Sequence, residues 1–238
     1  MDHTLPKHWL DYCKSEHKGF NCSIGPRGLG CGGCQTWTRL ATCANLPFRF
    51  RVIDVLTLRV VDAPPDCPYV ALSYVWGAAK VYKAYKADFQ PRPDGASFLD
   101  LGAVADQIPQ TVLDAIEVVK MLGARYLWVD ALCIAQDDNE ELKDTLPAMC
   151  LIYEAATVTI VAAFGSDANA GLPGARPGSR GAEQLTFSAQ DITLAHAAPQ
   201  LLDALADSAW KTRGWTFQED RFSRRKIIFT GSHVYWKC

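Results

Sequence analysis

Residues 109–132 read PQTVLDAIEVVKMLGARYLWVDAL and hold one helix signal followed by one strand signal. Proline is tolerated at the first helical position, because the amide that it lacks would have no partner there. Apolar side chains then recur at the spacing of one helix face, at Val112, Ala115, Ile116, Val119 and Leu122. Gly123 is a typical helix stop. The short apolar run at 125–132 that follows predicts a buried strand.

The segments on either side continue the alternation of strand and helix. Pro147 should kink or break one of these helices, since proline cannot donate the backbone hydrogen bond. The remaining expected elements are a strand or hairpin arm at 49–61, buried strands at 69–75 and 156–163, helices at 139–155 and 199–222, and a final hairpin of 226–230 with 233–237. This order predicts an α/β domain with a mainly parallel central sheet flanked by helices.

Composition divides the chain near residue 48. Residues 1–47 contain five of the nine cysteines and read as a Cys/His-rich N-terminal arm, whereas 48–238 read as the α/β domain. Residues 165–181 are rich in glycine and proline, which predicts a long loop inserted into that domain.

The overall composition excludes several classes of protein. The chain has 238 residues, 49% of them hydrophobic, and a net charge of −2. This balance gives no electrostatic reason to expect nucleic acid or a membrane surface as a partner. The sequence begins without an apolar signal segment, and its most apolar stretch, 155–164, is too short to span a bilayer. We therefore expect a cytoplasmic protein with reduced cysteines.

The N-terminal cysteines are candidate zinc ligands. Cys13 and His17 are four residues apart and would share one face of a short helix. Cys22 follows, and Cys31 and Cys34 have the two-residue gap that zinc knuckles use. A structural zinc ion, serving a regulatory or protein-contact element, is one interpretation. The other is a set of ordinary thiols in an irregular arm.

Polar residues follow the strand predicted at 125–132. Asp130, Gln136 and Asp137 should project beyond its carboxyl end, where open parallel sheets bind ligands. The alternative is structural: Asp130 would cap the following loop, and Asp137 or Asp138 would begin the next helix.

A tryptophan and a glutamate near the C-terminus are spaced for one helix face. Trp215 and Glu219 stand at i and i+4. A carboxyl beside an indole can lose solvation, which raises its pKa and suits it to acid–base or electrostatic work. The alternative is a surface glutamate paired with Arg213 or Arg221.

Taken together, these segments resemble the fungal heterokaryon incompatibility (HET) domain over residues 48–237. The stretches that carry the resemblance are YVALSYVWG at 69–77, Ile108-Pro109, YLWVDALCIAQDD at 126–138, Met149, Ile152-Tyr153, Ala155-Ala156, GLPG at 171–174 and RGWTFQE at 213–219. The family usually carries Asn where this chain has Ala135, so the hydrogen bond of that amide is absent here. Trp9, Leu10, Cys13, His17 and Cys22 resemble the segment that often precedes the domain.

The resemblance implies a cell-death effector of fungal nonself recognition, often joined to receptor or repeat modules. HET domains are thought to be distant relatives of Toll/interleukin-1 receptor (TIR) domains, which implies a TIR/flavodoxin-like sheet. In that alignment residues 72–74 fall on the first TIR strand and loop. Residues 215–219 fall on the W-x-x-x-E helix, whose glutamate is catalytic in the TIR members that cleave NAD.

The leading expectation is therefore cleavage of the nicotinamide–ribose bond of NAD or a related nucleotide, with Glu219 as the catalytic group and self-association completing the pocket. The residues expected to bind substrate are Ser73, Tyr74, Trp76, Gly77, Asp130, Gln136, Asp137, Arg213 and Trp215. The alternative is a non-catalytic self-associating module that recruits a downstream death effector. In such a module, Trp76 and Trp215 would anchor the self-association interface.

Overall fold

A computed structural model describes residues 4–17, 46–90, 98–181, 186–189, 191–195 and 197–238. The predicted ligands Cys22, Cys31 and Cys34 lie outside these residues. Among the described residues, no helix combines the length and apolarity needed to cross a membrane.

A seven-stranded sheet forms the centre of the molecule, in the order β2-β1-β4-β3-β5-β8-β9. Its four inner strands, β4, β3, β5 and β8, are parallel, and the strands at both edges are antiparallel. The strands are β1 (Arg51–Asp54), β2 (Arg59–Asp62), β3 (Tyr69–Ser73), β4 (Tyr126–Trp128), β5 (Val158–Ala162), β8 (Lys226–Phe229) and β9 (Val234–Lys237). The α/β prediction is confirmed, with a mixed rather than wholly parallel sheet.

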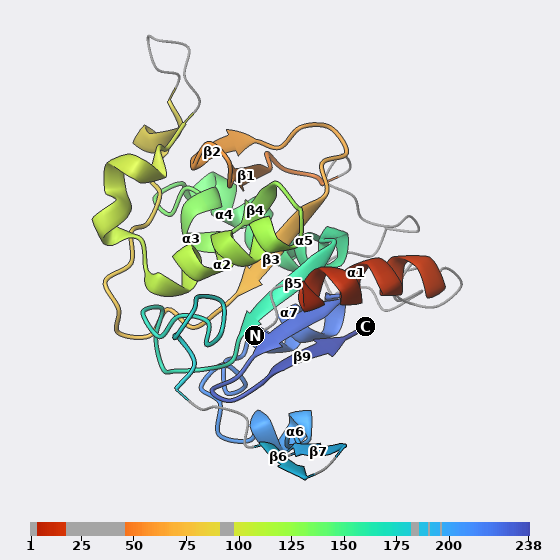
Figure 1. The fold of residues 1–238 in the computed structure, drawn as a ribbon. Helices are drawn as coiled ribbons and strands as arrows, with labels where there is room; N and C mark the ends of the chain where they lie inside the picture. Colours follow the sequence, from red (N-terminus) through yellow and green to blue (C-terminus); the bar gives the residue numbers. More distant parts are fainter. Residues whose placement is uncertain (1–3, 18–45, 91–97, 182–185, 190, 196) are drawn as a thin grey trace.

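Helices cover both faces of the sheet, with α2 on one face and α5 and α7 on the other (Figure 1). The α-helices are α1 (Leu5–Glu16), α2 (Gln110–Met121), α3 (Asp130–Cys133), α4 (Asn139–Thr145), α5 (Met149–Ala155), α6 (Leu201–Ala204) and α7 (Thr216–Phe222). Short 3₁₀ turns are η2 (Lys86–Phe89), η3 (Leu101–Gln107) and η4 (Leu146–Ala148). As predicted, the helix expected at 139–155 breaks at Pro147, which lies in η4 between α4 and α5.

The core fills the space between the helices and the inner strands, and every residue of β3, β5 and β8 is buried. Two buried tyrosines join α5 to the sheet by hydrogen bonds. Tyr69 Oη donates to the carbonyl of Ile152 (2.5 Å), and Tyr153 Oη donates to the carbonyl of Leu72 (3.3 Å). The ring of Tyr153 also packs edge-on against Trp128. Satisfied polar groups of this kind fix α5 firmly beside β3.

Three segments differ from the prediction. The strand expected at 125–132 ends at Trp128, because Asp130 accepts a hydrogen bond from the amide of Ala131 and begins α3. The helix expected at 199–222 is present only as α6 and α7; turns separate them. Ser208 Oγ donates to the carbonyl of Ala163 (2.7 Å) and holds these turns against β5. A separate hairpin, β6 (Thr186–Ala189) with β7 (Ile192–Ala195), was not predicted.

The long loop at 165–181 is irregular, as predicted, but is tied to α2 by hydrogen bonds, some of them to the carboxylate of Asp114. Asp114 is fully buried and accepts hydrogen bonds from Leu172 N (2.8 Å), Arg176 Nε (2.5 Å) and Gln110 Nε2 (2.8 Å). The same loop packs against Gly77, as the close approach of Ser166 to this glycine shows. The loop therefore supports the residues that follow β3.

Candidate functional site

Most of the predicted site residues come together at the carboxyl ends of β3 and β4. The sheet order reverses at β3, since β4 lies on one side of it and β5 on the other. Ligands of open α/β sheets bind beyond strand ends at such a switch point. Ser73 is the last residue of β3, Asp130 follows β4, and Glu219 is supplied by α7.

A buried chain of hydrogen bonds links Glu219 to the sheet. Trp210 Nε1 donates to Ser73 Oγ (2.6 Å), and Ser73 Oγ in turn donates to Glu219 Oε2. All three residues are buried, Glu219 to 5% relative exposure. The alternative of a surface glutamate paired with Arg213 or Arg221 is therefore wrong about exposure, since the carboxyl is buried and held by an internal hydroxyl, but right about Arg213 as the partner.

Arg213 supplies positive charge beside this carboxyl. Its Nη1 donates to the carbonyl of Tyr74, and its Nη2 lies 3.8 Å from Glu219 Oε1. Burial raises the pKa of Glu219, and the negative charge of Asp130 acts in the same direction. The hydrogen bond from Ser73 and the charge of Arg213 oppose that rise. Glu219 is thus a carboxyl removed from water but still supported in its ionised form.

Asp130 forms the second acidic group of the site. Its Oδ1 accepts hydrogen bonds from Trp76 Nε1 (3.3 Å) and from the amide of Ala131 (2.7 Å). Desolvation raises the pKa of Asp130, while these two donors oppose the rise. A cation lies over the ring of Trp76, because Lys83 Nζ is 4.8 Å from the ring centre.

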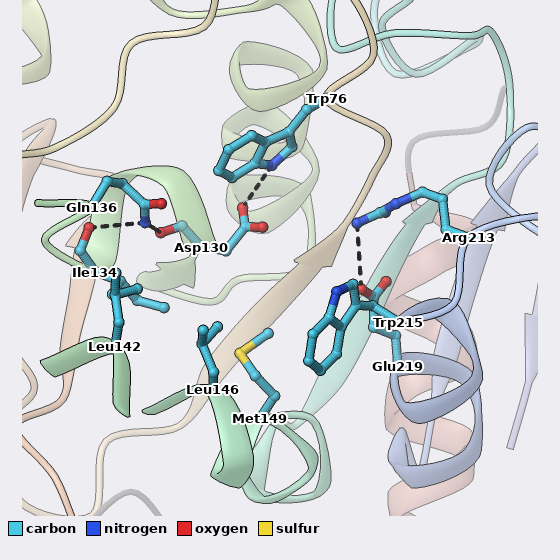
Figure 2. A pocket seen from close by; sticks show the side chains of 10 residues that line it. All are labelled: Trp76, Asp130, Ile134, Gln136, Leu142, Leu146, Met149, Arg213, Trp215 and Glu219. Carbon is cyan, nitrogen blue, oxygen red and sulfur yellow. Dashed lines mark hydrogen bonds and ion pairs between the residues drawn. The ribbon is translucent and has the colours of Figure 1, made fainter. Parts of the chain in front are cut away.

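These groups line a cavity of about 260 Å³. Figure 2 shows Asp130 and Trp76 on one side of it and Arg213, Trp215 and Glu219 on the other. Its lining residues are Trp76, Asp130, Ile134, Gln136, Leu142, Leu146, Met149, Arg213, Trp215 and Glu219. Trp215 is 51% exposed, so a ligand could reach its indole from solvent. The cavity combines an apolar wall with two carboxyl groups and a guanidinium.

The candidate residues divide into those that line the cavity and those that do not. Trp76, Asp130, Gln136, Arg213, Trp215 and Glu219 line it, and Ser73 lies behind Glu219. Three others are not lining residues, although Tyr74 is adjacent to the site through the hydrogen bond that its carbonyl accepts from Arg213. The pKa of the buried Tyr74 phenol is well above its usual value, through desolvation. Gly77 packs on the loop at 165–181. Asp137 accepts a hydrogen bond from the amide of Lys86 (2.7 Å).

The structural roles considered for the acids of 130–138 are present as well. Asp138 caps α4 by accepting from the amides of Glu140 and Glu141. Gln136 Nε2 donates to the carbonyls of Asp130 (3.1 Å) and Ile134 (3.2 Å). Its amide therefore holds the turn after α3 in shape as well as facing the cavity.

Sequence reasoning missed Trp210 and the apolar wall. Trp210 is 137 positions away from Ser73, so no local sequence pattern predicts their contact. Leu142, Leu146 and Met149 are on or between α4 and α5 and face the cavity. The break at Pro147 was the available signal, because it turns this segment and lets side chains from both helices face the same space.

The two predicted metal ligands that the structure describes, Cys13 and His17, lie at a different place. Cys13 is on α1 and His17 directly follows it, and together they border a second cavity with residues of β9.

Comparisons with known proteins give a consistent result. The family model described as "Heterokaryon incompatibility protein (HET)" matches residues 69–219, which include every cavity-lining residue. "Heterokaryon incompatibility protein 6, OR allele" of Neurospora crassa is 32% identical over 103 residues. That match covers 42% of this chain and 15% of the relative, so the chain spans only a small part of the relative's length. No solved structure matches.

Proposed function

This chain belongs to the heterokaryon incompatibility (HET) family, and from that premise we propose that it is a cell-death effector domain of fungal nonself recognition that hydrolyses the nicotinamide–ribose bond of NAD or a related nucleotide. The observation that carries the proposal is the buried Glu219 carboxyl, held by Ser73 at the wall of a cavity between two tryptophans.

The proposed reaction needs one well-placed carboxylate. The C–N bond between ribose and nicotinamide breaks, and its electron pair leaves with the nicotinamide nitrogen, which becomes neutral. The ribose gains oxocarbenium character, which a nearby carboxylate stabilises. Water then adds to the sugar carbon and releases a proton, which gives ADP-ribose and nicotinamide. In this scheme Glu219 faces the ribose and either stabilises the charge or holds a ribose hydroxyl.

The other lining residues suit the remaining parts of a nucleotide. Trp215 and Trp76 offer aromatic faces for a pyridinium or a base, and Arg213 offers a guanidinium for a phosphate. Asp130 and Gln136 supply acceptors and donors for hydroxyl groups. Gln136 and Trp76 make hydrogen bonds within the protein, and these bonds fix the side chains that the substrate would contact.

The order of the parallel strands agrees with the proposed TIR/flavodoxin-like relationship. Numbered from β3 along the chain, the strands β4-β3-β5-β8 have the order 2-1-3-4, which matches the first four positions of the flavodoxin-like order 2-1-3-4-5. The next strand in this sheet, β9, is antiparallel. Glu219 of α7 lies beside Ser73 at the end of β3, and this position supports the proposed W-x-x-x-E alignment.

The size of the cavity supports a role for self-association. Pockets that enclose whole small ligands usually have volumes of about 300–1,000 Å³, whereas this cavity has about 260 Å³. In the proposed arrangement the cavity takes the nicotinamide–ribose end of a dinucleotide, and the rest extends past the exposed Trp215. A second copy of the chain over that opening would complete the pocket and make activity dependent on assembly.

Nicotinamide release from NAD tests the proposal. The purified chain is incubated with NAD over a series of protein concentrations, and the release rate per chain is measured. The proposal predicts release whose specific rate increases with concentration. Absence of release at every concentration, including one at which sedimentation shows an assembled protein, would contradict it.

One observation favours the alternative, a non-catalytic self-associating module. Trp215 is 51% exposed and Phe217 is 73% exposed at the start of α7, and exposed aromatic residues often anchor interfaces. If the domain acts only by recruitment, Phe217→Ser should abolish self-association and cell death, while NAD stays intact in the presence of the wild-type chain.

A further inference from the structure

A second cluster of potential ligands lies where the two ends of the described chain meet. Cys13 of α1, His17 just after it, and Cys238 after β9 place their ligand atoms within 4.8 Å of one another. Figure 1 shows α1 and the C-terminus side by side at this edge of the sheet. Cys13 and Cys238 are 225 positions apart in sequence, and the spacing of the N-terminal cysteines could not indicate that Cys238 would join them.

The donor atoms suit a soft divalent cation. Zinc prefers thiolate sulfur and imidazole nitrogen, with bonds of about 2.0–2.3 Å, so a tetrahedral ion separates its ligand atoms by about 3.4–3.8 Å. His17 Nδ1 and Cys238 Sγ are 3.4 Å apart, which is already such a separation. The two sulfurs and the nitrogen lie within 4.8 Å of one another and would need only small movements to reach one ion.

The surroundings of the cluster also fit a bound metal. Arg225 Nε donates a hydrogen bond to Cys13 Sγ (3.1 Å), and N–H donors to a ligand atom orient it and tune a metal site. The cluster borders a cavity of about 340 Å³ with aromatic walls that include Trp9 and Trp236. The buried Cys13 and the exposed Cys238 leave one side open, through which an ion and a fourth, solvent-derived ligand could enter.

We infer that Cys13, His17 and Cys238 form a zinc-binding site that fastens α1 to β9. The ion would be bound by two thiolates and one imidazole nitrogen, and binding would release the two thiol protons. It would add to the contact that Trp9 and Trp236 already make, with ring centres 6.4 Å apart. Zinc would thereby couple the N-terminal helix to the edge of the α/β domain, at a cavity separate from the one that Glu219 lines.

Metal analysis and cobalt spectroscopy test this site directly. The full chain is purified under reducing conditions, dialysed against zinc, and measured by inductively coupled plasma mass spectrometry. We expect about one equivalent of zinc per chain. With Co²⁺ in place of Zn²⁺, we expect the sulfur-to-cobalt charge-transfer band and the intense visible bands of a tetrahedral thiolate site. Zinc should also raise the Tm of the wild-type chain.

Two variants and a matched control separate this site from other cysteines. Cys238→Ser and His17→Gln alter side chains at or near the surface, and we expect each to remove the zinc equivalent and the cobalt bands while circular dichroism stays unchanged. His8→Gln changes a histidine that borders the same cavity but is outside the cluster, and it should retain the metal. Zinc retained by Cys238→Ser and His17→Gln would overturn the inference, as would a wild-type chain that binds no zinc.

Discussion

Ser73 donates a buried hydrogen bond to Glu219 across 146 positions of sequence. The serine is fixed because it ends the central strand of the sheet, and its hydroxyl oxygen also accepts from the indole of Trp210. One hydroxyl therefore connects the sheet to both segments that close the site, namely the turns around Trp210 and the helix α7.

Replacement of Ser73 by alanine should destabilise the fold as well as the site. The variant leaves the buried N–H of Trp210 without its partner and removes the donor to Glu219, so we expect a loss of about 1–3 kcal/mol in the free energy of unfolding. Urea denaturation measures it. Ser188→Ala removes an exposed hydroxyl that pairs with Thr193, and this control should cost less than ~0.5 kcal/mol. Equal stability of Ser73→Ala and the wild type would disprove the hydrogen-bonded chain.

The pKa of Glu219 makes a specific prediction about stability and pH. Burial raises this pKa above the ordinary value of 4.5, so the folded protein holds the proton more tightly than the unfolded chain does. The stability that protonation of Glu219 contributes to the free energy of unfolding is therefore fully present below pH 4.5. It is lost as the pH rises through the folded-state pKa of Glu219. The variant Glu219→Gln stays neutral, so it should gain stability relative to wild type as the pH rises through this interval.

Unfolding by urea at a series of pH values checks this difference. Asp130 also has a raised pKa but is present in both proteins, so the difference between variant and wild type reports chiefly on Glu219. Glu117→Gln, on an exposed position of α2, is the control, and its difference from wild type should not follow the same curve. A Glu219→Gln curve parallel to that of wild type at every pH would show that the carboxyl is not desolvated.

Gly77 should be intolerant of any side chain. Its φ is +58°, and a Cβ there would overlap the backbone oxygen of Ser166 and the Cβ of Asp167. Gly178 has a φ of +73° with no atom near its potential Cβ, so Gly178→Ala measures the backbone strain by itself, about 1 kcal/mol. Gly77→Ala should cost roughly 1–3 kcal/mol more, from the overlap. Equal Tm values for the two variants would contradict the packing of the loop on Gly77.

The sequence predicted those parts of the fold that depend on local patterns. The helix after Pro109, the strand expected at 69–75 and observed at 69–73, and the final hairpin were all indicated by apolar patterns and by glycine or proline near their ends. The hairpin β6–β7 escaped notice, because each strand has only four residues, and those of β6 are all exposed, so no buried face marks them. The turns between α6 and α7 were not predicted, because they are stabilised by tertiary hydrogen bonds, such as that of Ser208, which the local sequence does not indicate.

The candidate site was predictable to the extent that its residues follow strand ends or match a family pattern. Asp130 and Glu219 were found in these two ways and line one cavity. Asp137 was predicted as a site residue because it also follows the end of a strand, but its carboxylate accepts a hydrogen bond from the amide of Lys86 instead. Trp210 and Cys238 could not be found, because their partners are brought to them only by the complete fold.

The rate of nicotinamide release from NAD by the wild-type chain and by Glu219→Gln tests the central claim most directly. Glu154→Gln is the matched control, since burial also raises the pKa of Glu154 but this residue is not part of the cavity wall. We expect the rate to fall roughly 100-fold or more in Glu219→Gln and to be unchanged in Glu154→Gln. A Glu219→Gln protein that cleaves NAD as fast as the wild type would contradict the account.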